Sequence, residues 1–155
     1  MILFLDINGV LSPTTGRHSG PDVSPSCAKV LQHIVDTQFT RIVITSSWRF
    51  YYTAAEFGKI FAEAGINTPV IGLTPNLPYS STVGSTPTRG HEIQAWLNDH
   101  PETSGSPILI LEDGLDLTPL RAWAYYTNPQ TGLVPDDLPP IKKLIDQQLP
   151  DEADL

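Results

Sequence analysis

Short apolar runs recur along the chain, and each is separated from the next by a stretch of helical periodicity or by a loop. Continuous apolar runs of this length, bounded by turn residues, are typical of strands that are buried on both faces of a parallel sheet. The predicted strands span residues 1–5, 41–45, 68–73, 107–113 and 121–127.

Between these runs, apolar residues recur at the three- and four-residue spacing of an amphipathic helix. The first such stretch follows Ser24 or Ser26, either of which is a suitable helix cap, and ends near Gln38. Further helices are predicted at residues 53–65, 88–100 and 135–149, and the last of them begins either at residue 135 or only at Pro140.

Apolar strands that alternate with helices predict an α/β fold, with a three-layer, Rossmann-like parallel sheet, helices on both faces and right-handed crossovers. The sequence has no internal repeat and no linker long enough to divide it, and 155 residues suit one domain. We therefore predict a single domain at residues 1–150 and a frayed acidic tail at residues 151–155. In such sheets, ligands bind at the carboxyl ends of the strands.

The composition narrows the class of protein. Apolar residues make up 40% of the chain, as in ordinary globular proteins, and the formal net charge of -8 argues against broad non-specific binding to nucleic acids or membranes. The only cysteine, Cys27, excludes an internal disulfide and a zinc site built from cysteines. The first apolar run is far too short for a signal peptide or a membrane span, so we expect a cytoplasmic protein.

Polar side chains come after the last apolar residues of three of the predicted strands: Asp6, Ser46 and Asp113. A single aspartate at such a position has roughly even odds of being only a turn residue or a helix cap. Three strand ends at one edge of a sheet are harder to explain in that way. Carboxylates that converge repel one another unless a cation lies between them, and such oxygen ligands suit Mg²⁺. A hydroxyl and a cationic side chain nearby suit a phosphate group.

The pattern resembles the haloacid dehalogenase (HAD) superfamily of phosphohydrolases. The first motif of that superfamily is Asp-x-Asp-Gly at the end of the first strand, and here it reads "DING", Asp6 to Gly9. The second motif is a Ser or Thr at the end of the next strand, and it corresponds to Ser46 in "ITSSW".

The other two motifs of the superfamily also have counterparts. The third, a Lys or Arg ahead of or on a helix, is matched by Arg89 in "TRGHEI", and the fourth by the acidic strand end "ILILEDGLD", with Glu112, Asp113 and Asp116. More narrowly, "SSWR", "RGHEIQAWL", "EDGLDL" and "NPQTGLVPDDL" are similar to a small branch without a cap domain, which is related to the phosphatase domains of RNA-repair proteins.

The resemblance implies a role for each matched residue. Asp6 is the expected nucleophile, which forms an aspartyl-phosphate. Ser46 is expected to hydrogen-bond a phosphoryl oxygen, and Arg89 to neutralise charge on the transferring group. Mg²⁺ is expected to bind Asp6, the backbone carbonyl of Asn8, and Asp113. The other two acidic residues of the fourth motif are candidates for the outer shell of the metal or for holding Arg89.

Asn8 departs from the pattern, because the superfamily has an aspartate here that protonates the leaving oxygen and then activates water. Asparagine transfers no proton, and general acid-base catalysis is typically worth about 10²–10⁴-fold, so we predict a weak phosphatase. Three explanations remain open: a natural change to a binding or transferase-like protein, a substitution made to slow turnover, and partial deamidation of the Asn-Gly pair. Asp22 is the nearby carboxylate that would substitute.

The stretches between the first, second and third motifs are too short for a separate cap domain, which indicates an open site. An open site admits the phosphorylated end of a large molecule, or relies on a partner or a loop for closure. The expected partner is a phosphorylated small molecule, such as a nucleotide, or a nucleic-acid end. We expect substrate contacts from Gly9, Ser47, Arg49 and Arg17, and a structural role is the open alternative for Arg49. Trp48 is more simply explained by packing. The sequence leaves the oligomeric state open.

A rival interpretation is a catalytically silent module that keeps the fold and the metal but not the turnover, and Asn8 is the feature that favours it. A serine hydrolase that uses Ser46 or Ser47 with a histidine is a further alternative, but it leaves the aspartates at the strand ends unexplained.

Overall fold

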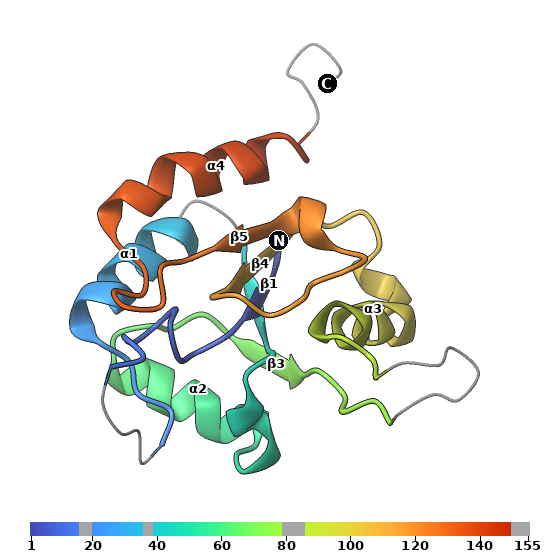
Figure 1. Ribbon diagram of the computed structural model, residues 1–155, viewed down its shortest axis with the longest axis horizontal. Coiled ribbons are helices and arrows are strands. Elements are labelled where there is room, and N and C mark those ends of the chain that lie inside the picture. The colour runs from blue at the N-terminus through green and yellow to red at the C-terminus, as the bar shows by residue number, and fades with distance from the viewer. Residues whose placement is uncertain (16–19, 36–38, 79–85, 150–155) are drawn as a thin grey trace.

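A computed structural model of the chain, which describes residues 1–15, 20–35, 39–78 and 86–149, has a single parallel sheet at its centre (Figure 1). The five strands are arranged in the order β3-β2-β1-β4-β5, and every neighbouring pair is parallel. They span Ile2–Leu5 (β1), Arg41–Ile44 (β2), Val70–Leu73 (β3), Ile108–Glu112 (β4) and Ala124–Tyr126 (β5). The predicted parallel sheet is confirmed.

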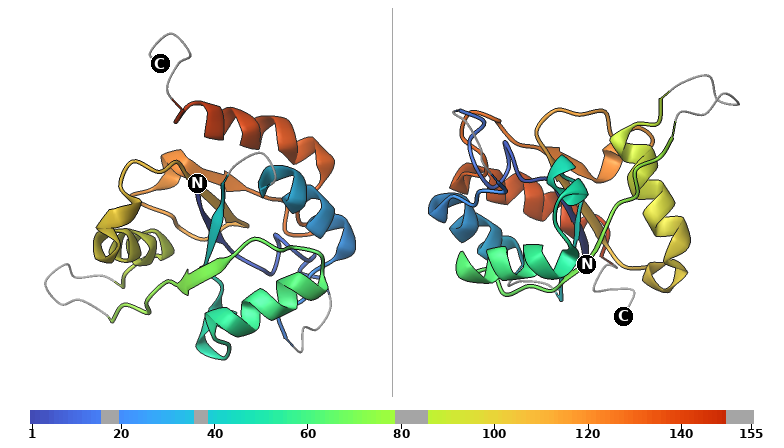
Figure 2. Two further views of the ribbon diagram at one scale, coloured as in Figure 1. Left: turned by 180° about the vertical axis from the view of Figure 1, so that it is seen from behind. Right: turned by 90° about the horizontal axis from the view of Figure 1, so that it is seen from below.

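Helices cover both faces of this sheet and complete the three layers (Figures 1 and 2). Three of them pack on one face, and α3 lies on the other. The helices span Pro25–Val35 (α1), Ala54–Glu63 (α2), Arg89–Asp99 (α3) and Leu138–Asp146 (α4). The structure therefore confirms the predicted α/β class with helices on both faces.

Successive residues of the strands point to opposite faces and feed two separate clusters of the core. Leu3 and Leu5 of β1 face α1, α2 and α4, whereas Ile2 and Phe4 face α3. Phe4 meets Trp96 of α3 edge to face, with ring centroids 5.5 Å apart. Because all four residues of β1 are fully buried, the continuous apolar run at the start of the sequence reflects burial on both faces.

Two predicted elements begin later in the structure than in the sequence pattern. A 3-10 helix, Arg121–Trp123, occupies the start of the fifth predicted strand, and β5 follows it. Another 3-10 helix, Pro135–Asp137, precedes α4, and Asp137 accepts a 2.5 Å hydrogen bond from the hydroxyl of Tyr125. The predicted end of the first helix at residues 36–38 and the predicted tail at 151–155 lie outside the described residues.

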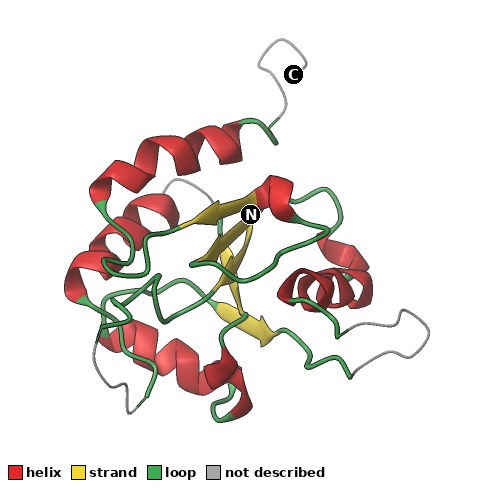
Figure 3. Cartoon of the chain, viewed as in Figure 1, coloured by secondary structure: helices red, strands yellow, loops and turns green. Residues whose placement is uncertain are grey.

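The strand order creates one position in the sheet, beside β1, where the direction of the chain reverses. Figure 3 shows the strands at the centre of the fold, with the helices around them. From β1 the chain moves outward through β2 and β3, and it then returns through α3 to β4 on the other side of β1. In open parallel sheets, ligands bind beside the carboxyl ends of the strands at such a reversal. The topology therefore points to the ends of β1 and β4 as the place for a site.

The connections around this place are short. Between β1 and β2 the described residues form one helix, α1, and between β2 and α3 they form a 3-10 helix (Ser47–Phe50), α2 and β3. Within the described ranges these connections contain no folded cap, and the assignment of residues 1–150 to one domain stays a prediction. In the same part of the chain, no helix has the length and apolar character needed to cross a membrane.

Candidate active site

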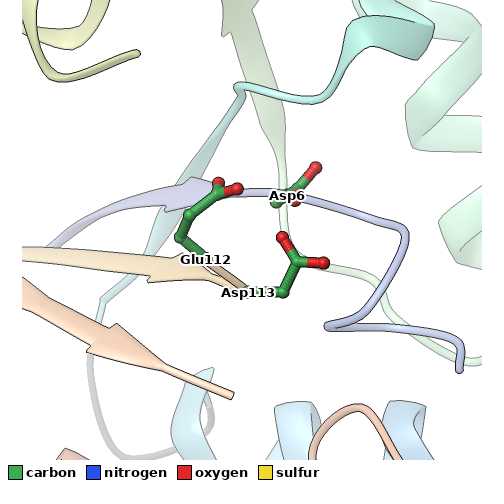
Figure 4. Close-up of side chains that lie close together, drawn as sticks. All are labelled: Asp6, Glu112 and Asp113. Atoms are coloured by element: carbon green, nitrogen blue, oxygen red, sulfur yellow. The ribbon is translucent and has the colours of Figure 1, made fainter. Parts of the chain in front are cut away.

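Three carboxyl groups meet at the ends of the two central strands (Figure 4). Asp6 follows β1, Glu112 is the last residue of β4, and Asp113 follows it. Each group offers an oxygen that lies within 4.8 Å of the oxygens offered by the other two. Glu112 is fully buried and Asp6 is 7% exposed, so these charges lie in a largely water-free environment.

The backbone fixes the position of Asp6. Its N–H donates to the carbonyl of Leu111 at 3.1 Å, which continues the pairing of β1 with β4 beyond the end of β1. Its own carboxylate Oδ1 accepts the N–H of Ile7 at 2.9 Å. The side chain is thus held at the strand end, with its charge directed into the cluster.

Gly9 makes room for the carboxylate of Asp113. Its φ of +81° is in the left-handed region, and a Cβ at this position would lie 2.2 Å from Oδ2 of Asp113. The hydroxyl of Thr127 donates to the Gly9 carbonyl at 2.6 Å, and the N–H of Thr127 donates to the carbonyl of Glu112 at 2.9 Å. Thr127, directly after β5, therefore ties the loop after β1 to the end of β4.

Arg89 brings a positive charge to the cluster from the first turn of α3. Its Nη1 lies 3.6 Å from Oδ1 of Asp6 and 3.6 Å from Oε2 of Glu112. Among the described residues, neither Nη1 of Arg89 nor either carboxylate oxygen of Glu112 has a hydrogen-bond partner. Buried polar atoms without hydrogen-bond partners are rare in native proteins, and their presence here fits a site that binds an ion.

The electrostatics of the cluster fit a small divalent cation. Burial and the neighbouring charge of Asp6 raise the pKa of Glu112 to about 10. Burial likewise raises the pKa of Asp6, although Arg89 acts in the opposite direction. Three acidic groups in this space ionise together only if a cation compensates their charge, and carboxylate oxygens are the ligands that Mg²⁺ prefers.

Ser46 lies at the end of the neighbouring strand β2. The N–H of Thr45 donates to the carbonyl of Leu5 at 3.0 Å, so the segments that follow β1 and β2 begin next to each other. The hydroxyl of Ser46 accepts the N–H of Trp48 at 3.2 Å and thereby caps the 3-10 helix Ser47–Phe50. Ser46 is buried, whereas Ser47 is exposed.

Trp48 links this segment to the first motif. Its indole Nε1 donates to the side-chain oxygen of Asn8 at 3.4 Å, and Asn8 itself is half-buried. Asp22, the carboxylate that we considered as a substitute for an acid at position 8, is exposed and lies beside Ile60 and Glu63 of α2 instead. Within the described residues, the acidic cluster does not include it.

Arg49 is buried, and all three nitrogens of its guanidinium donate to atoms of the protein. Its Nη2 forms an ion pair with Glu92 of α3 at 2.9 Å. The substrate contact that we predicted for Arg49 therefore has no support in the geometry. Arg17, the other predicted basic contact, lies outside the described residues.

The sequence interpretation missed two residues that support the site, Glu92 and Thr127. Glu92 had a detectable signal, because it precedes Trp96 by four residues and so places a charge on the buried face of an amphipathic helix. Thr127 had none, since a threonine after a short strand is common. The structure also separates the acidic residues of the fourth motif: Glu112 and Asp113 join the cluster, but Asp116 is exposed and accepts the N–H of Thr118.

Comparison with known families matches residues 2–138 to a model described as the HAD domain in Swiss Army Knife RNA repair proteins. The chain belongs to this family. The resemblance to the HAD superfamily and to its RNA-repair branch is thereby confirmed, and membership indicates hydrolase chemistry of the phosphatase type. The matched region of this HAD domain contains the whole acidic cluster and Arg89. No curated protein and no solved structure matches the chain.

Proposed function

We propose that this HAD domain is a Mg²⁺-dependent phosphomonoesterase that uses Asp6 as its nucleophile. The observation that carries the proposal is the convergence of Asp6, Glu112 and Asp113 with the guanidinium of Arg89 at one end of the sheet. A buried carboxylate held beside a cationic side chain is suited to attack an anionic phosphorus centre.

The reaction has two displacements. A carboxylate oxygen of Asp6 forms a bond to phosphorus while the bond from phosphorus to the ester oxygen breaks, and the leaving alkoxide takes up a proton from solvent water. Water then attacks the aspartyl-phosphate, releases inorganic phosphate and restores the carboxylate of Asp6. Arg89 and the hydroxyl of Ser46 are the groups that we assign to balance the charge on the phosphoryl oxygens.

Asp6, Asp113 and the backbone carbonyl of Asn8 are the groups that we assign to Mg²⁺. When bound, the ion supplies positive charge that lets an anionic nucleophile approach an anionic phosphate. Glu112 is assigned to Arg89, since its Oε2 lies 3.6 Å from Nη1 of that side chain. Gly9 supports this arrangement through the space that it leaves for Asp113.

Asn8 is the residue that we expect to slow phosphate-ester hydrolysis by the domain. An amide neither protonates the leaving oxygen nor activates water, and its side-chain oxygen is already engaged by the indole of Trp48. We therefore infer slow turnover with poor leaving groups, by about 10²–10⁴-fold relative to a chain with aspartate at this position.

The proposed substrate is a nucleotide or a phosphorylated nucleic-acid end. Within the described residues the connections around the site contain no folded cap, and the printed description of the family refers to RNA repair. Two aromatic side chains next to the Ser46 segment are exposed, Phe50 by 53% and Tyr51 by 75%. Aromatic rings near a phosphate site suit stacking with nucleobases.

The proposal is tested by hydrolysis of para-nitrophenyl phosphate, with and without Mg²⁺, by the chain and by its Asn8→Asp variant. We expect Mg²⁺-dependent activity that rises strongly in Asn8→Asp, and complete loss of activity when Asp6→Asn is added. Persistent turnover in the variant that lacks the carboxylate of Asp6 would show that the nucleophile is wrongly assigned.

A second candidate, a phosphate- and metal-binding module without turnover, is favoured by Asn8 alone. In that case neither the chain nor Asn8→Asp hydrolyses phosphate esters, but both bind orthovanadate in the presence of Mg²⁺. Calorimetric titration with vanadate distinguishes this module from a domain that binds no oxyanion at all.

A further inference from the structure

The buried ion pair between Arg49 and Glu92 connects two parts of the site that are distant in sequence. We propose that this pair is a positioning device, which holds the Ser46 segment at a fixed distance from the turn of α3 that carries Arg89. The inference rests on the proposed function, because Ser46 and Arg89 are its two phosphate-binding groups. It replaces the direct substrate contact that the sequence suggested for Arg49.

On one side, the guanidinium of Arg49 donates hydrogen bonds to backbone carbonyls that directly follow β2 and β3. Its Nη1 donates to the carbonyl of Thr45 at 2.8 Å and to that of Ser46 at 3.2 Å. Its Nε donates to the carbonyl of Thr74, directly after β3, at 3.0 Å. The backbone at Ser46 is therefore fixed by a side chain that comes from the following 3-10 helix.

On the other side, the same guanidinium reaches across to α3. Its Nη2 donates to Oε2 of Glu92 at 2.9 Å, and Glu92 lies three residues after Arg89, on the next turn of the helix. The side chains of the pair are 3% and 11% exposed, so solvent screens the interaction weakly. The position of α3, which carries Arg89 and Glu92, is therefore coupled through Arg49 to the position of the backbone at Ser46.

Stability alone does not explain such a pair. Removing two charges from water is unfavourable, and apolar residues of similar volume are often as stable in the same place. Arg49 also presents a rigid, planar set of donors, which lysine lacks. The five hydrogen bonds and contacts that surround it specify a geometry: three backbone carbonyls, one carboxylate, and the ring of Phe50 at 4.5 Å from Cζ.

The test uses the Asn8→Asp chain as the parent, so that turnover is measurable. We expect Glu92→Ala to lower kcat/KM for para-nitrophenyl phosphate by about 10²-fold, the effect of a misplacement on the order of 1 Å. Glu92→Gln keeps an acceptor for Nη2 and is expected to retain most of the activity. The double variant Arg49→Met with Glu92→Ala is expected to be no worse than Arg49→Met alone, because the two residues act as a unit.

These outcomes separate positioning from substrate contact. If Arg49 bound the substrate directly, loss of Arg49 would abolish phosphate binding while Glu92→Ala would leave kcat and KM close to those of the parent. That second result would overturn the proposal. A matched control is Gln148→Ala, which removes the bonds of Gln148 to both backbone groups of Ile108 at the opposite end of β4. It is expected to lower the melting temperature but not kcat/KM.

An inactive Asn8→Asp parent would mean that the proposed function fails, and the positioning device is then tested without turnover. The indole N–H of Trp48 and the amide of Ser46 report on the segment in ¹H-¹⁵N spectra. Glu92→Ala is expected to shift both signals, while Gln148→Ala leaves them in place. Unchanged signals in Glu92→Ala would overturn the proposal independently of any activity.

Discussion

The carboxylate of Asp113 occupies the space that a side chain on Gly9 would fill. A Cβ at Gly9 would lie 2.2 Å from Oδ2 and 2.7 Å from Cγ of Asp113, at a backbone φ of +81°. The fourth residue of the first motif is therefore a glycine for two reasons, the left-handed conformation and the close approach of an acidic group from β4. This contact connects a motif in the first strand with one more than a hundred residues later.

Gly9→Ala is expected to displace Asp113 and so to reduce the affinity for Mg²⁺, in addition to a loss of stability of about 1–3 kcal/mol from the strained backbone. Calorimetric Mg²⁺ titration and thermal unfolding measure the two effects. Gly105→Ala is the matched control, because Gly105 has a similar φ of +87° but no atom within 4 Å of the added Cβ. Equal Mg²⁺ affinity in both variants would contradict the assigned role of Gly9.

The raised pKa of Glu112 predicts how stability depends on pH when a chelator removes divalent ions. Between the usual pKa of 4.5 and the folded-state pKa of about 10, the folded chain holds a proton that the unfolded chain has released. Because the folded state then binds more protons, the free energy of unfolding falls as the pH rises through this window. We expect the melting temperature in EDTA to fall from about pH 5 to about pH 9.

Glu112→Gln is the variant that checks this prediction, because an amide does not titrate. The decline in melting temperature should largely disappear in Glu112→Gln, and added Mg²⁺ should reduce it in the unaltered chain, since a cation favours the ionised carboxylates. A pH profile in EDTA that is the same with and without Glu112→Gln would show that another group governs it.

Thr88 and His91 form a reciprocal cap at the start of α3. His91 Nδ1 accepts the N–H of Thr88 at 3.0 Å, while the hydroxyl of Thr88 accepts the N–H of His91 at 3.2 Å. We expect His91→Ala to destabilise the fold by about 1 kcal/mol, whereas His91→Glu preserves the reciprocal cap. Urea unfolding measures both, and a loss in His91→Glu equal to that in His91→Ala would contradict the capping role.

The exposed ring of Tyr51 tests the substrate class. On an oligonucleotide with a terminal phosphate, replacing Tyr51 by alanine is expected to raise KM by the loss of about 1–3 kcal/mol of stacking. On para-nitrophenyl phosphate the same variant should keep the kinetics of its parent, because this small ester does not extend beyond the phosphate site. Equal losses on both substrates would indicate a disturbed site and no base stacking.

Much of the fold was predictable because burial on both faces leaves a continuous apolar run, as in β1 and β4. The positions of Asp6 and Asp113 follow directly from the ends of those runs. The late starts of β5 and α4 were not predictable in the same way. Their first residues form 3-10 turns, and the bond from Tyr125 to Asp137 that accompanies the second turn joins residues twelve positions apart.

The sequence identified most of the residues that lie at the site, but it did not predict the contact that each of them makes. The sequence shows that Arg49 is a cation next to a predicted phosphate-binding motif. The direction in which its side chain points depends on Glu92, which lies 43 residues away. The same limit applies to Glu112, since its distance to Arg89 depends on how α3 packs across the sheet. Local patterns identify chemistry at strand ends, whereas contacts between layers decide which side chain serves which purpose.

The position of the acidic cluster at the reversal of the sheet has a consequence for synthesis of the chain. Asp6 precedes its carboxylate partners, at positions 112 and 113, by more than a hundred residues. A nascent or truncated polypeptide that ends before β4 therefore carries Asp6 without the groups that would complete a metal site beside it. Under the proposed function, a chain that lacks β4 is therefore expected to transfer no phosphoryl group until the pairing of β4 with β1 completes the cluster.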